Sequence, residues 1–102
     1  MTTDGLSIGF SVFHGGKLIR EVSFDRPTIN IGKLSTANLR LSDKNASRKH
    51  AVIERQADGT WHLRDLESTN GTSLNGQPVQ SKALKDGDRI LIGATTIVVR
   101  LA

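Results

Sequence analysis

Apolar residues alternate with polar ones along most of this chain, and short glycine-containing turns separate the alternating runs. Ile8, Phe10 and Val12, for example, alternate with small residues, and the pair Gly15-Gly16 follows them. Successive side chains of a strand point to opposite faces, so a period of two predicts strands with one buried face. No stretch of ten or more residues shows the period and capping residues of a helix. The sequence therefore predicts an all-β domain.

The expected strands are short, and a Gly, Asn or Asp signal ends each of them. Asp58-Gly59 and Asn75-Gly76 are typical hairpin turns, because glycine adopts a positive φ without penalty. The alternating runs cover residues 7–12, 18–24, 28–31, 38–41, 51–55, 61–65, 72–74, 77–79, 89–92 and 95–101. Strands of this length and spacing indicate a β-sandwich or a barrel.

One core is expected, because a chain of 102 residues has the length of a single domain. A domain of this size buries only about two-thirds of the surface of its unfolded chain, so the inward positions must be almost entirely apolar. These positions are Ile8, Phe10, Val12, Leu18, Val22, Ile29, Ile31, Leu39, Leu41, Val52 or Ile53, Leu63, Ile90, Ile92, Ile97 and Val99.

Composition excludes several kinds of site. The chain has no cysteine, which excludes disulfides, thiol catalysis and cysteine-ligated metals and fits a reducing, cytoplasmic compartment. Its three histidines are scattered, so we expect neither a metal nor a cofactor. No run approaches the ~20 apolar residues of a transmembrane helix, and residues 1–5 lack the features of a secretory signal.

The formal net charge of +4 suggests an acidic partner, although solvated lysine and arginine side chains would explain it equally well. No stretch holds five like charges, as a nucleic-acid-binding arm would. The four aromatic residues form no basic stacking surface of the kind that binds single strands. We therefore expect no nucleic-acid partner and no membrane insertion, and any anion site should be local.

Three loops, at residues 31–38, 43–50 and 65–72, hold the unusual polar residues. Each loop taken alone could be an ordinary turn, since Ser, Asn and Gly are common turn residues. Together the loops supply cations, hydroxyls and an amide, which are the groups that hold a phosphate dianion with its three acceptor oxygens. These groups belong to Lys33, Ser47, Arg48, Thr69 and Asn70.

Five short motifs, in a fixed order along the chain, resemble those of a known family. The motifs are Gly32-Lys33, Ser47-Arg48-x-His50, Ser68-Thr69-Asn70-Gly71-Thr72, Asn75-Gly76 and Leu84-x-Asp86-Gly87-Asp88-x-Ile90-x-Ile92-Gly93. In this order and spacing the chain resembles a forkhead-associated (FHA) domain, which we expect to be a single domain over residues 6–101. The resemblance implies a β-sandwich of about eleven short, mostly antiparallel strands with binding loops at one end. It also implies binding of phosphothreonine in a partner protein, in signalling by a cognate Ser/Thr kinase.

The resemblance also implies roles for individual residues. The phosphate-binding residues would be Lys33, Ser47, Arg48 and Thr69. Asn70 would bind the peptide main chain, and Asn45 would contact the residue three places after the phosphothreonine. Gly32, Gly71 and the buried His50 would support the loops without touching the ligand.

Two alternatives follow from the same residues. Lys33 stands where the family usually has arginine, and lysine is a flexible point charge without arginine's planar fork. We therefore expect weaker or less selective phosphate binding, and a phosphorylation-independent interaction module of the same fold is the alternative. Ser47, His50 and Asp65 are the residue types of a hydrolase, but no Gly-x-Ser-x-Gly motif is present and we expect no enzyme.

Overall fold

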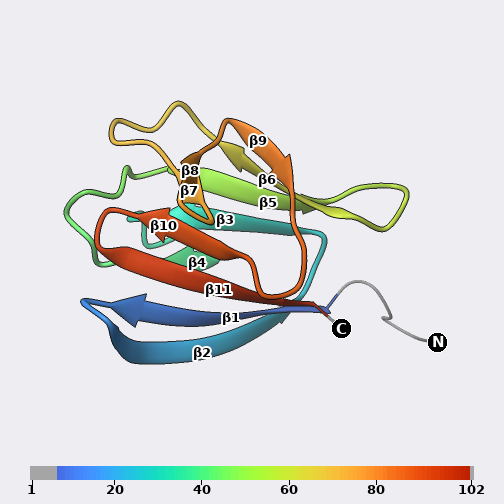
Figure 1. Ribbon diagram of the computed structural model, residues 1–102, viewed down its shortest axis with the longest axis horizontal. Helices are drawn as coiled ribbons and strands as arrows, with labels where there is room; N and C mark the ends of the chain where they lie inside the picture. The colour runs from blue at the N-terminus through green and yellow to red at the C-terminus, as the bar shows by residue number, and fades with distance from the viewer. Residues whose placement is uncertain (1–6, 102) are drawn as a thin grey trace.

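The computed structural model describes residues 7–101 and builds them into eleven β-strands (Figure 1). The strands are β1 (Ser7–His14), β2 (Lys17–Asp25), β3 (Thr28–Gly32), β4 (Leu39–Arg40), β5 (Ala51–Arg55), β6 (Trp61–Asp65), β7 (Ser73–Leu74), β8 (Gln77–Pro78), β9 (Ser81–Ala83), β10 (Arg89–Ile92) and β11 (Thr95–Leu101). No helix that could span a membrane occurs in this part of the chain.

The strands form two sheets. One has the order β2-β1-β11-β10-β7-β8 and the other the order β4-β3-β5-β6-β9. Neighbouring strands are antiparallel except β3 and β4, which run parallel. The predicted all-β sandwich of mostly antiparallel strands is therefore confirmed.

The core lies between the two sheets, where the inward side chains of β1, β3, β5, β6, β10 and β11 meet. Phe10, Ile29 and Leu63 are completely buried there. Each large apolar side chain buried in this way contributes roughly 1.5–3 kcal/mol before entropy is counted. The core also contains residues outside the predicted set, namely Ala46, Ala51, Trp61, Leu74 and Leu84.

Leu18 was predicted as a core residue, and this prediction is wrong: 49% of the residue is exposed. Val12 of β1 pairs with Arg20, whereas the next residue, Phe13, pairs with Leu18, so Ile19 is an extra residue in β2. This bulge shifts the alternation of β2 by one residue. Leu18 therefore shares the face of Phe13 instead of the core face of Val12.

Sheet pairing brings the three polar loops to one end of the sandwich. Ala51, the first residue of β5, pairs with Ile31 near the end of β3 and with Asp65 at the end of β6. The β3–β4, β4–β5 and β6–β7 loops consequently start or finish at the same end of these strands. Figure 1 shows them at the end of the molecule opposite the start of β1 and the end of β11.

Candidate functional site

A shallow depression lies between the three loops, and we call it the loop depression. Its lining comes from the β3–β4 loop, the β4–β5 loop and the β6–β7 loop. The lining residues are Lys33, Lys44, Asn45, Ala46, Ser47, Arg48, Glu67, Thr69 and Asn70. All six residues predicted to contact phosphate or peptide therefore lie around one concave surface.

Backbone contacts hold the β3–β4 loop against the β4–β5 loop. The amide of Lys33 donates to the carbonyl of Ser47 at 3.1 Å, and the amide of Leu34 donates to the carbonyl of Arg48 at 3.3 Å. Gly32 permits this approach, because a Cβ atom at that position would lie 2.0 Å from the Arg48 carbonyl oxygen. The glycine fixes the distance between the lysine and the serine of the depression.

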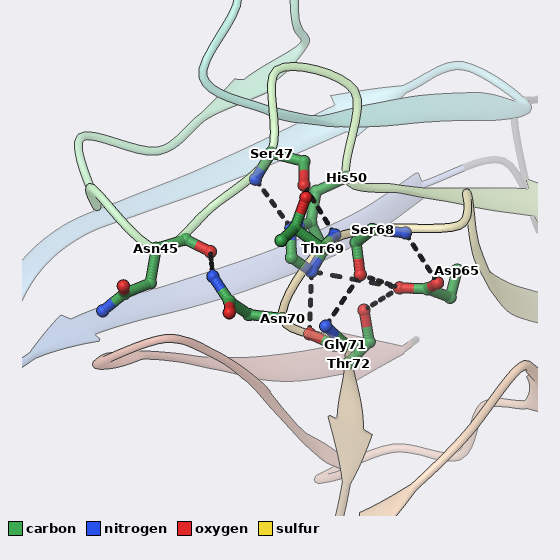
Figure 2. Close-up of polar contacts among 9 residues, drawn as sticks. All are labelled: Asn45, Ser47, His50, Asp65, Ser68, Thr69, Asn70, Gly71 and Thr72. Atoms are coloured by element: carbon green, nitrogen blue, oxygen red, sulfur yellow. Dashed lines mark hydrogen bonds and ion pairs between the residues drawn. The ribbon is translucent and has the colours of Figure 1, made fainter.

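His50 joins the β4–β5 loop to the β6–β7 loop from behind the depression. It is completely buried, and its Nδ1 accepts a hydrogen bond of 2.9 Å from the amide of Ser47. The proton therefore sits on Nε2, which donates to the carbonyl of Gly71 at 2.9 Å. Because both ring nitrogens are engaged with backbone, the imidazole braces the two loops and does not face the depression (Figure 2).

Asp65 organises the start of the β6–β7 loop. Its carboxylate accepts hydrogen bonds from the amide and hydroxyl of Ser68 and from the hydroxyl of Thr72, and Ser68 Oγ in turn accepts from the amide of Gly71. Burial opposes ionisation of Asp65, but the hydrogen bonds from Ser68 and Thr72 outweigh it and hold the pKa of the carboxyl below its usual value. The ionised carboxylate therefore fixes the loop that carries Thr69 and Asn70.

Ser47, Thr69 and Asn70 meet across the loops at the depression itself. Ser47 Oγ accepts a hydrogen bond of 3.1 Å from the amide of Thr69, and Asn70 Nδ2 donates to the carbonyl of Asn45 at 3.0 Å. Figure 2 shows these side chains approaching one another from the two loops. No hydrogen bond within residues 7–101 uses the Ser47 hydroxyl proton, which is therefore available to an acceptor in the depression.

The charge of the depression is mostly positive. Lys33, Lys44 and Arg48 line it, and no ion pair within the described chain involves any of the three. Glu67 is the acidic exception, and its φ of 54° lies in the left-handed region that non-glycine residues rarely adopt. The surface offers cations, a hydroxyl and amides to an anion.

Sequence reasoning missed Lys44 and Glu67 as lining residues. Lys44 belongs to the polar loop at residues 43–50, so its position between Asp43 and Asn45 could have indicated that it lines the site. Nothing in the sequence indicated the backbone conformation that directs Glu67 to the site. The hydrolase alternative gains no support, because His50 Nδ1 accepts the Ser47 amide proton instead of facing the Ser47 hydroxyl.

Comparisons with known proteins agree with this geometry. The family model described as the FHA domain matches residues 29–93. This chain belongs to the FHA-domain family. A solved structure from a structural and functional analysis of phosphothreonine-dependent FHA domain interactions has a TM-score of 0.82 and 35% identity, with 94% of this chain and 97% of that chain covered.

Two curated relatives are similar to this chain over part of their length. The oxoglutarate dehydrogenase inhibitor of Corynebacterium diphtheriae is 39% identical over 74 residues, which cover 72% of this chain and 51% of the relative. The FHA domain-containing protein FhaA of Mycobacterium tuberculosis is 46% identical over 72 residues, which cover 70% of this chain and 13% of the relative. The matched region thus spans about half of the first relative and a small part of the second.

Proposed function

We propose that this FHA domain binds phosphothreonine in a partner protein, with the phosphate seated in the loop depression. The observation that carries the proposal is the convergence of Lys33, Ser47 and Arg48 on one surface. No hydrogen bond among residues 7–101 uses the hydroxyl proton of Ser47 there. A phosphate dianion carries about −1.5 to −2 charges and three strong acceptor oxygens, and it matches this set of donors.

The six residues predicted to contact phosphate or peptide have distinct parts in the proposed complex. Lys33 and Arg48 supply positive charge, and the Ser47 hydroxyl donates to a phosphate oxygen, with Thr69 beside it. Asn70 would exchange its bond to the Asn45 carbonyl for a bond to the peptide main chain, and the Asn45 side chain would contact a later residue of the peptide. The buried His50–Gly71 bond would keep these groups in place.

The wider role that we propose is regulatory. An FHA structure from work on phosphothreonine-dependent interactions and a relative named as an enzyme inhibitor both support a regulatory binding role for this chain. A Ser/Thr kinase would create the ligand by phosphorylating the partner. The proposal includes a cytoplasmic location and treats residues 6–101 as one binding domain.

Phosphorylation-independent binding through the same surface is the second candidate. It is favoured by Lys33, which lacks the bidentate fork of arginine, and by the acidic residue Glu67 in the lining, whose charge repels phosphate. The two candidates differ in whether the partner must carry a phosphate.

A degenerate peptide library with one fixed phosphothreonine tests the proposal. The domain should retain phosphothreonine peptides and not the same library with threonine. Lys33→Ala, Ser47→Ala and Asn70→Ala should each weaken binding of a selected peptide about tenfold or more, the equivalent of ~1.4 kcal/mol. Lys33→Arg should retain binding, because it keeps the charge.

Lys85→Ala provides the matched control, because Lys85 is an exposed lysine away from the depression. Its affinity should equal that of the wild type, and thermal unfolding should show that all variants fold. Unchanged affinity in the three loop variants would remove the proposed site.

A further inference from the structure

A second concave surface borders the loop depression, and we call it the side hollow. It encloses about 340 Å³ beneath the β3–β4 loop. Its lining includes the aliphatic residues Leu34, Ala37 and Leu66 together with the cations Arg48 and Lys49. The side hollow thus combines an apolar wall with positive charge.

Three aliphatic residues that line the side hollow lie outside the folding core, whereas two others, Ile31 and Ala51, belong to it. Leu34, Ala37 and Leu66 are each half-buried, and none belongs to the core cluster or to the apolar residues packed against it. Partly exposed aliphatic side chains that lie outside the core cluster and line a concave surface are typical of a binding surface.

The side hollow is continuous with the loop depression. Arg48 lines both, and the consecutive residues Lys33 and Leu34 line the depression and the hollow respectively. The hydrogen bond from the Leu34 amide to the Arg48 carbonyl fixes the two surfaces relative to each other. An extended peptide advances about 3.3 Å per residue, so a peptide anchored in the depression reaches the hollow within a few residues.

We propose that the side hollow binds an aliphatic side chain of the phosphopeptide, within three residues of the phosphothreonine but not at the third position after it, and that Lys49 favours an acidic residue beside it. This inference rests on the proposed function and names the peptide class that the site selects. The subsite is separate from the contact expected at Asn45, because Asn45 lines the loop depression and not the side hollow.

The test is a positional scan by fluorescence anisotropy with a labelled phosphothreonine peptide. Each position from three before to three after the phosphothreonine carries Leu, Gly, Asp or Lys in turn. With the wild-type domain, one position other than the third after the phosphothreonine should prefer Leu over Gly about fivefold to tenfold, in line with partial burial of one aliphatic side chain. With Leu66→Ala the preference should fall to about twofold or less, while the Gly peptide binds both proteins equally.

Two further variants sharpen the test. Leu18→Ala, at an exposed leucine on β2 outside the hollow, should keep the full preference for Leu. Lys49→Glu, at an exposed position, should reverse a preference for Asp over Lys at a neighbouring peptide position. Loss of the Leu preference in Leu66→Ala but not in Leu18→Ala supports the subsite.

Other outcomes overturn it. A Leu preference that survives in Leu66→Ala, or the absence of a Leu preference at every position other than the third after the phosphothreonine, contradicts the inference while phosphate binding stands. Equal binding of the threonine and phosphothreonine forms contradicts the proposed function itself, and the inference falls with it. The unphosphorylated peptide therefore separates the two failures.

Discussion

At the residue scale, Glu67 is an acidic residue in a site that we propose to bind a phosphate dianion. It lines the loop depression together with the cations Lys33, Lys44 and Arg48, and its backbone has a φ of 54°. A non-glycine residue in this region costs roughly 1–2 kcal/mol. Glu67 therefore lowers the stability of the fold through its backbone conformation and weakens phosphate binding through its charge.

Replacement of Glu67 separates these two effects. Glu67→Gln removes the charge alone, and it should raise affinity for a phosphothreonine peptide up to about fivefold, the equivalent of ~1 kcal/mol for an exposed pair of charges. Glu67→Gly should raise affinity similarly and also stabilise the fold, by up to about 1 kcal/mol. Calorimetric titration and urea unfolding measure the two quantities, and weaker phosphopeptide binding by both variants would contradict the account.

His50 should matter for stability more than any side chain that lines the depression. His50→Ala leaves the Ser47 amide and the Gly71 carbonyl without partners and opens a cavity in a fully buried place. The free energy of unfolding should fall by about 2–5 kcal/mol in urea titrations. Lys85→Ala serves as the control with little change, and a His50→Ala variant as stable as the wild type would show that the imidazole is not a brace.

At the scale of elements, the contact between β3 and the β4–β5 loop depends on one missing side chain. Gly32→Ala would place a methyl group against the Arg48 carbonyl, a backbone atom that cannot move without displacing Ser47. The variant should lose about 1–3 kcal/mol of stability and bind phosphopeptide more weakly. Gly9→Ala is the control, because its nearest atom belongs to the flexible Arg100 side chain at 3.1 Å, and equal effects of the two substitutions would contradict this explanation.

The strands and turns show how far the sequence could predict the fold. Period-two alternation located most strands, and Asn75 and Gly76 both have the positive φ expected for their turn. The bulge that exposes Leu18 arises from cross-strand pairing, which local alternation does not encode. All three residues of strand β9 (Ser81–Ala83) are exposed, and the strand pairs with β6, so no apolar pattern marked it.

For the site, too, local sequence predicted some features, whereas long-range contacts were not predictable. Loop composition was sufficient to place Lys33, Ser47 and Asn70 together, because hydroxyls, cations and amides were concentrated in three loops. Long-range hydrogen bonds were not predictable in this way. The hydrogen bonds that Asp43 accepts from the amide of Ala94 and the hydroxyl of Thr95 span about half of the chain, and only the folded structure shows them.

At the scale of the whole molecule, two buried carboxylates hold the binding end together. Asp43 ties the β4–β5 loop to the β10–β11 turn, and Asp65 fixes the β6–β7 loop. Burial opposes ionisation of both, but hydrogen bonds prevail: those from Asn45, Thr95 and Ala94 lower the pKa of Asp43 below its usual value. The same balance lowers the pKa of Asp65.

These pKa shifts predict acid sensitivity. A carboxyl whose pKa is lower in the folded state than in the unfolded state stabilises the fold above its usual pKa of 3.8, and this stabilisation is lost as the pH falls through the folded-state value. Urea unfolding of the wild type and of Asp65→Asn, from about pH 2 to pH 7, should show a gap that is constant near neutrality and shrinks below about pH 4. A gap that stays the same across this range would contradict the role given to Asp65.

The whole account depends on whether phosphate decides binding. Calorimetric titration of this domain with one library-selected peptide, prepared as the threonine and the phosphothreonine forms, measures this directly. We predict that the phosphothreonine form binds at least about a hundredfold more tightly, the equivalent of ~2.7 kcal/mol. Equal affinities for the two forms would contradict phosphothreonine recognition and leave a phosphorylation-independent module of the same fold.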